Sequence, residues 1–90
     1  MDKVNELKKL GKEVFEAENL NQVIEILDNA NEKNIITDYF FTDDMDLFVL
    51  VNNKAYIITA DYNKQYDATI ISVFEIPVEE FFEIKKLYVP

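Results

Sequence analysis

Hydrophobic residues recur at intervals of three and four along the first part of the chain. Leu7, Leu10 and Val14 fall on one side of a helical wheel, and the lysines and glutamates between them fall on the other side. This period predicts an amphipathic helix over residues 2–17. Gly11 lies on the apolar side of that helix, and we interpret it as a point where another segment approaches closely, in preference to a hinge.

A second helix is predicted over residues 19–33. Asn19 is followed three residues later by Gln22, which is the capping-box pattern that opens a helix. Apolar residues then occupy one side of the segment at 100° per residue, while acidic and amide side chains occupy the other. With so short a link before it, this helix is predicted to form an antiparallel hairpin with the first.

From Ile35 onward the pattern changes to short runs of β-branched and aromatic residues broken by Asp and Asn, which is typical of strands. The links between the runs are short, so an antiparallel meander is the expected topology. The pair Asn52-Asn53 suits a two-residue type I′ turn. The four predicted strands cover residues 35–42, 45–51, 54–60 and 66–76.

The end of the chain predicts a closing helix. Pro77 suits a first helical turn, acidic residues follow it, and Lys85 and Lys86 lie near the far end, which matches the helix dipole. The element order is therefore ααββββα. We expect a single α+β domain over residues 1–90, with a four-stranded antiparallel sheet and helices mainly on one face.

Several strands carry large apolar groups on both faces, for example at Tyr39-Phe40-Phe41 and over residues 47–51. Either the closing helix crosses to the second face, or an aromatic patch stays exposed as a protein interface. Sequence alone leaves both explanations open. The residues from which such a patch would be drawn are Tyr39, Phe41, Tyr56, Ile58, Ile71 and Val73.

Composition narrows the chemistry. The 90 residues include no His, Cys, Trp or Arg. Without His, neither a neutral-pH general base nor an activated Ser or Cys nucleophile can be built in the usual way, so we predict no catalytic residue. A paired-carboxylate enzyme is the third-ranked interpretation. The lack of Cys suits a reducing cytoplasm, and we expect neither an export signal nor a membrane span.

The run Asp43-Asp44-Met45-Asp46 offers three carboxylates in a turn, and oxygen ligands of this kind hold Ca²⁺ or Mg²⁺. The spacing does not fit an EF-hand loop, because no Gly allows the sharp turn and no Glu closes the loop. We interpret the run as a solvated hairpin tip and predict neither a metal nor another cofactor.

The net charge of −9 is distributed unevenly. Residues 13–53 contain ten acidic residues and one lysine, whereas the other 49 residues contain eight acids and eight lysines. Glu18, Glu25 and Glu32 repeat every seven residues, which predicts an acidic stripe with steps of about 10 Å along the second helix. The charge also opposes direct binding of nucleic acid.

An acidic surface can serve solubility alone, it can bind a basic patch on a protein, or it can imitate the phosphates of a nucleic acid. In size and composition the chain resembles phage and mobile-element inhibitors such as anti-restriction, anti-CRISPR and glycosylase-inhibitor proteins. That resemblance implies an acidic inhibitor that binds a nuclease or another nucleic-acid-handling enzyme, and a DNA mimic is one form that such an inhibitor can take.

The alternative is an immunity protein that neutralises a toxin, or another intracellular adaptor, binding through the aromatic sheet face. A homodimer is compatible with either hypothesis. The candidate interface residues are Glu18, Glu25, Asp28, Glu32, Asp38, Asp43, Asp44, Asp46, Tyr39 and Phe41.

Overall fold

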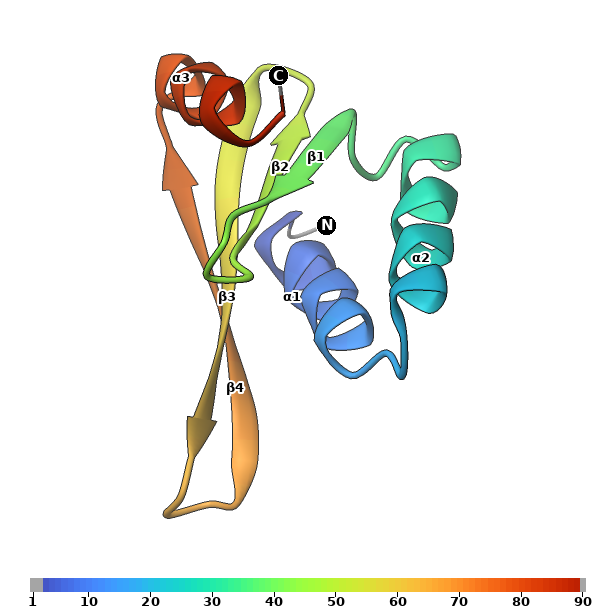
Figure 1. The fold of residues 1–90 in the computed structure, drawn as a ribbon, viewed down its shortest axis with the longest axis vertical. Coiled ribbons are helices and arrows are strands. Elements are labelled where there is room, and N and C mark those ends of the chain that lie inside the picture. The colour runs from blue at the N-terminus through green and yellow to red at the C-terminus, as the bar shows by residue number, and fades with distance from the viewer. Residues whose placement is uncertain (1–2, 90) are drawn as a thin grey trace.

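The computed structural model describes residues 3–89 and has the predicted α+β fold, with three helices and a four-stranded antiparallel sheet (Figure 1). The helices are α1 (Lys3–Phe15), α2 (Leu20–Glu32) and α3 (Val78–Tyr88). The strands are β1 (Asp38–Phe41), β2 (Leu47–Val51), β3 (Lys54–Asn63) and β4 (Ala68–Ile76).

The strands follow one another across the sheet in the order β1-β2-β3-β4, so the predicted meander is confirmed. Val51 pairs with Lys54, which leaves Asn52 and Asn53 as the two turn residues. Of these two, Asn52 alone takes a positive φ, 57°, whereas a type I′ turn needs positive φ at both positions. The predicted turn position is therefore right and the predicted turn type is wrong.

The first strand begins later than predicted because the residues before it cap α2. Asn34 takes a φ of 61°, and the amide of Ile35 donates to the carbonyl of Ala30 at 2.9 Å. These are the features of a Schellman motif, which satisfies the last carbonyls of a helix. The two isoleucines that follow Asn34 therefore end the helix instead of starting a strand, and Ile36 is buried in the core.

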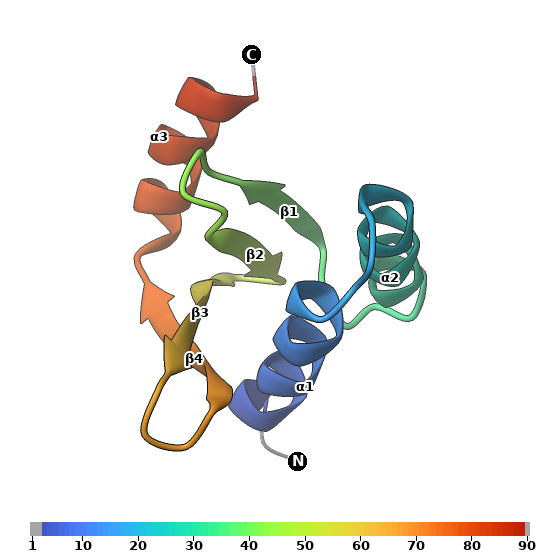
Figure 2. The same cartoon turned by 60° about the horizontal axis from the view of Figure 1, so that its bottom comes forward.

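Helices α1 and α2 cover one face of the sheet (Figure 2). A β-carbon at Gly11 would lie 2.6 Å from Ile58 Cγ2 and 3.0 Å from Ile71 Cγ2. The expectation of a close contact at Gly11 is thus confirmed, because only glycine lets α1 lie so near β3 and β4. The buried residues of this first core are Leu7, Leu10, Val14, Leu27, Ala30, Ile36, Leu47, Val49, Val51, Tyr56 and Ile58.

Helix α3 crosses to the opposite face and builds a second core there (Figure 2). Two of the three helices thus lie on one face, and the crossing of the closing helix is the explanation that holds of the two that the sequence leaves open. The reason is that all five residues of β2 are buried, so both sides of the strand need a cover. The buried residues of the second core are Phe40, Phe48, Leu50, Ala55 and Phe81.

Strands β3 and β4 continue beyond the rest of the sheet as a two-stranded arm (Figure 1). Pairing between β2 and β3 ends at Leu47 and Ile58, whereas β3 and β4 remain paired as far as Asn63 and Ala68. The strand β3 is therefore longer than predicted. At the tip, Asn63 Oδ1 accepts hydrogen bonds from the amides of the second and third residues after it, at 2.9 and 3.2 Å.

Candidate functional site

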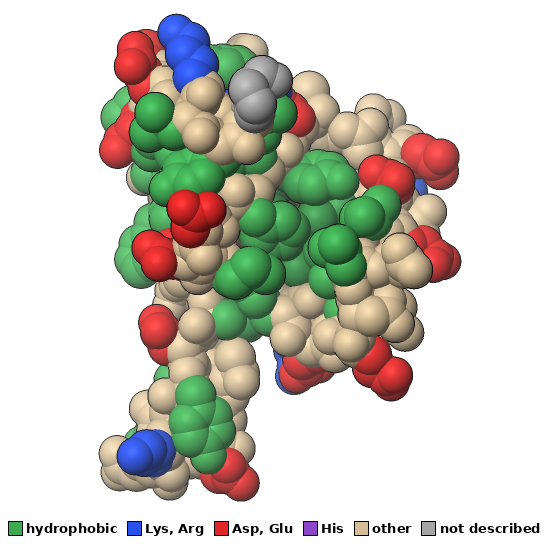
Figure 3. All heavy atoms as spheres, viewed as in Figure 1, with side chains coloured by type: hydrophobic (Ala, Val, Ile, Leu, Met, Phe, Trp, Pro, Cys, Tyr) green, Lys and Arg blue, Asp and Glu red, His purple; other side chains and the backbone are tan. Residues whose placement is uncertain are grey.

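An apolar groove opens where the end of α1 and the start of α2 face the β1–β2 hairpin. Its volume is about 390 Å³. Figure 3 shows hydrophobic side chains gathered on this side of the molecule between the sheet and α2. The groove is lined by Val14, Phe15, Ala17, Asn19, Leu20, Val23, Phe41 and Met45, of which one residue is polar.

The helical wall of the groove is fixed by the cap of α2. The amide of Gln22 donates to Asn19 Oδ1 at 2.9 Å, and Gln22 Oε1 accepts from the amide of Glu18 at 2.9 Å. The predicted capping pattern is therefore confirmed, with the reciprocal bond reaching one residue further back than in the standard box. This cap starts the helix at Leu20, whose side chain is 67% exposed beside the groove.

The opposite wall is a tight hairpin loop. The amide of Met45 donates to the Thr42 carbonyl at 3.0 Å, and the Thr42 amide donates to the Asp46 carbonyl at 3.1 Å. Met45 has a φ of 66° and is 60% exposed. That conformation costs a residue with a β-carbon about 1–2 kcal/mol, and glycine would adopt it freely. The hairpin therefore holds a large apolar side chain at the edge of the groove at a cost in backbone strain.

Most of the predicted interface carboxylates are exposed. Glu25, Asp28 and Glu32 are exposed on α2, and Asp43 and Asp44 are exposed at the hairpin tip. Within residues 3–89, none of these five belongs to an ion pair. They are therefore open to a partner's charges.

The predicted stripe of three glutamates needs a correction. Glu18 is exposed, but it precedes the cap residue Asn19 and so lies outside α2. The helical repeat consequently joins only Glu25 and Glu32, at about 10 Å along the axis. Glu18 belongs instead to the connection that borders the groove.

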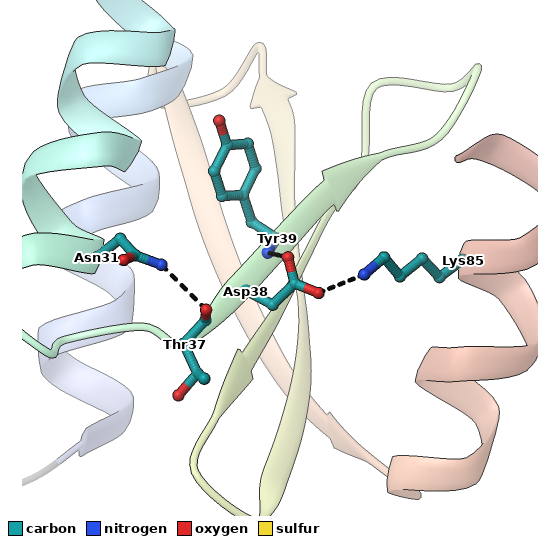
Figure 4. A network of polar contacts seen from close by, with 5 residues as sticks. All are labelled: Asn31, Thr37, Asp38, Tyr39 and Lys85. Atoms are coloured by element: carbon teal, nitrogen blue, oxygen red, sulfur yellow. Dashed lines mark hydrogen bonds and ion pairs between the residues drawn. The ribbon is translucent and has the colours of Figure 1, made fainter. Parts of the chain in front are cut away.

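Asp38 was predicted as an interface carboxylate, but in the structure it is paired with a lysine of the same chain. Lys85 Nζ of α3 donates to Asp38 Oδ2 at 2.6 Å, and the amide of Tyr39 donates to Asp38 Oδ1 at 2.8 Å (Figure 4). A lysine thus neutralises this carboxylate, which ties β1 to α3. Asp38 therefore helps to hold the fold together and adds no free charge to the acidic surface.

The aromatic sheet face is mostly covered. Tyr56 and Ile58 are buried beneath α1 and α2, and Tyr39 is half-buried against the same core. Burial raises the pKa of the Tyr39 hydroxyl, and the negative charges of Asp28 and Asp38 raise it further. Of the two explanations that the sequence leaves open, the exposed patch is therefore the one that fails, because two helices pack on this face, and Phe41 remains only as part of the groove lining.

Other carboxylates surround Asp46 in the loop between β1 and β2. Burial raises the pKa of Asp46, and repulsion from Asp44 and Asp61 raises it further. Residues 3–89 contain no group of three or more His, Cys, Asp or Glu side chains arranged to hold a metal ion.

No helix in this part of the chain has the length and apolarity needed to cross a membrane.

The sequence predicts Phe41 as an interface residue but does not reveal the groove, because the other lining residues follow the patterns of core, helix-start and loop positions. A further signal is Met45, a large apolar residue among aspartates where a predicted turn meets a predicted strand. Comparison with family models, with curated proteins and with solved structures finds no match for the chain. Function is therefore inferred from the groove and from the charge around it.

Proposed function

We propose that the protein acts without catalysis, as an acidic inhibitor that binds the basic surface of a nucleic-acid-handling enzyme such as a nuclease. The observation that supports this function is the concentration of the whole net charge of −9 in residues 13–53. Folding gains nothing from such a bias, because like charges repel one another and the repulsion opposes the compact state.

The position of these charges also supports binding. Glu25 and Glu32 project from a helix that lies at the side of the sheet, and Asp43 and Asp44 lie at a hairpin tip (Figure 1). A basic surface that meets these elements would be drawn in by long-range attraction and would exchange its counterions for carboxylates. The same basic surface is what a nuclease uses to hold phosphates, so binding here would exclude nucleic acid.

The test is a comparison of two charge reversals. Wild-type protein, the double variant Glu25→Lys with Glu32→Lys, and the control Glu79→Lys with Glu83→Lys are used to capture proteins from a lysate of the source cells. The control residues are also exposed but lie on α3, in the charge-balanced part of the chain. We expect a captured enzyme that wild type and control retain and that the α2 variant loses.

The captured enzyme is then purified and its binding of fluorescent duplex DNA or RNA is measured against added inhibitor. Wild type and control should displace the nucleic acid, and displacement should weaken steeply as salt rises from about 50 to 200 mM. Displacement by the α2 variant, or binding of nucleic acid and inhibitor together, would overturn the proposal and leave solubility as the role of the charge.

A further inference from the structure

The two segments that form the walls of the groove are strongly acidic. Residues 13–23 and 41–46 contain six carboxylates and no lysine. Phe15 and Ala17 alternate with acidic neighbours along the chain, and Met45 lies directly between Asp44 and Asp46. The apolar lining thus belongs to two acidic segments, in which Glu16, Glu18, Asp43 and Asp44 are exposed, whereas Glu13 lines a separate hollow beside Lys33.

Met45 gives a second and independent reason to assign a function to the groove. Its backbone has the left-handed φ of 66°, and its side chain lines the groove with more than half of its surface exposed. A turn selected only for stability would carry Gly or Asn at this position. The long and polarisable side chain of methionine is suited to contacts with apolar groups of varied shape.

These observations fit one class of occupant. We propose that the groove binds a basic amphipathic helix of the partner protein, with apolar anchors at positions i and i+4 in the groove and with lysines or arginines against the surrounding carboxylates. The proposal rests on the proposed function and names the kind of partner segment that the inhibitor would bind. A second copy of this chain is disfavoured as the occupant, because each copy has a net charge of −9.

The test uses a fluorescein-labelled peptide of about four helical turns, built from leucine and lysine with the leucines on one face. Its binding is followed by fluorescence anisotropy against wild type and three variants. The variants are Met45→Gly and Leu20→Ala in the two walls, and Ile24→Ala on α2 as an exposed apolar control outside the lining.

We expect each wall variant to weaken peptide binding by tenfold or more and the control to leave it unchanged. Met45→Gly should retain or raise the melting temperature, because glycine relieves the strained turn, and the loss of binding then cannot be ascribed to unfolding. Leu20→Ala removes the opposite wall without touching that turn. A scrambled peptide of the same composition should bind at least tenfold more weakly, because its leucines no longer share a face.

Three results would overturn the proposal: equal binding of both peptides, wild-type affinity in both wall variants, or occupation of the groove by a second copy, seen as a dimer that the wall variants dissolve. Failure of the proposed function looks different. If the wall variants lose the peptide but no enzyme captured through Glu25 and Glu32 releases its nucleic acid, the assignment of the groove is supported and the proposed inhibitor function is rejected. If capture depends on the α2 carboxylates but the peptide fails to bind, the groove assignment is rejected and the inhibitor function is not.

Discussion

The two faces of the sheet are closed in different ways. The first face is covered by two helices, its core is mostly aliphatic, and α1 reaches the strands through the bare backbone of Gly11. The second face is covered by α3 alone, and three of the five buried residues of its core are phenylalanines. Phe40 stacks on Phe48 with centroids 4.8 Å apart, and Phe81 meets Phe40 edge-on at 5.1 Å.

This difference explains how a single helix covers the second face of the sheet, whereas two helices cover the first. Each aromatic ring buries about 150–250 Å², so a few rings fill the space under a single helix. Aliphatic side chains fill less, so the first face needs a close approach by α1 and a second helix beside it. The two-helix cover leaves its open end at the β1–β2 hairpin, and the groove lies there.

The largest effect is expected from the ring at the centre of the second face. Phe81→Ala should lower the free energy of unfolding by about 3–5 kcal/mol, because Phe81 has no exposed surface and its removal leaves a cavity. Urea denaturation measures the loss. The neighbour Phe82, which is 44% exposed and meets Phe81 edge-on, is the matched control and should cost only about 1 kcal/mol on truncation. Equal losses would mean that α3 is not held by this core.

An intermediate effect is expected where the first face is tightest. Gly11→Ala should destabilise the protein by about 1–2 kcal/mol. Overpacking costs about 1–3 kcal/mol, and the higher helix propensity of alanine offsets up to about 1 kcal/mol of this cost. In an Ile58→Ala background the nearest methyl group is gone and the contact with Ile71 at 3.0 Å remains, so the same substitution should cost less. A stabilising Gly11→Ala in the wild-type background would contradict the close approach.

The smallest effect is expected at the ion pair that joins α3 to β1. Lys85→Met should cost about 1 kcal/mol or less, because both side chains are roughly one-third exposed and water screens the pair. Thermal unfolding at low and high salt measures it, and the cost should shrink with salt. The control Lys86→Met removes an exposed lysine with no ion pair in the described chain and should change little. A large and salt-independent loss at position 85 would indicate a packing role for the lysine stem.

The element order could be predicted because each local signal agrees with the final fold. The hydrophobic period changes from helical to strand-like after Ile35, Asn19 marks the start of α2, and short links leave little choice of topology. The strand bounds were less predictable, since Asn34 and Ile35 complete a helix cap that competes with strand pairing. The polar residues after Ala60 likewise extend β3 because β4 pairs with them.

The candidate site was only partly predictable. Exposure of the carboxylates on α2 follows from the helical period, but the partner of Asp38 is 47 residues away along the chain, and no local pattern reveals it. The groove depends on the angle at which α1 and α2 meet the β1–β2 hairpin. The position of Phe41 and Met45 on opposite sides of a short turn does not reveal that angle.

The two-stranded arm has a consequence for the motion of the molecule. Its outer pairs, from Asp61 and Ile70 to Asn63 and Ala68, belong to the same two strands as the buried centre of the sheet, but neither β2 nor the first core flanks them. Opening from the tip therefore breaks hydrogen bonds without uncovering a core, and its free energy is lower than that of global unfolding. We therefore expect the free energy of opening to rise from the tip of the arm toward the centre of the sheet, and amide hydrogen exchange along β3 and β4 would measure this gradient.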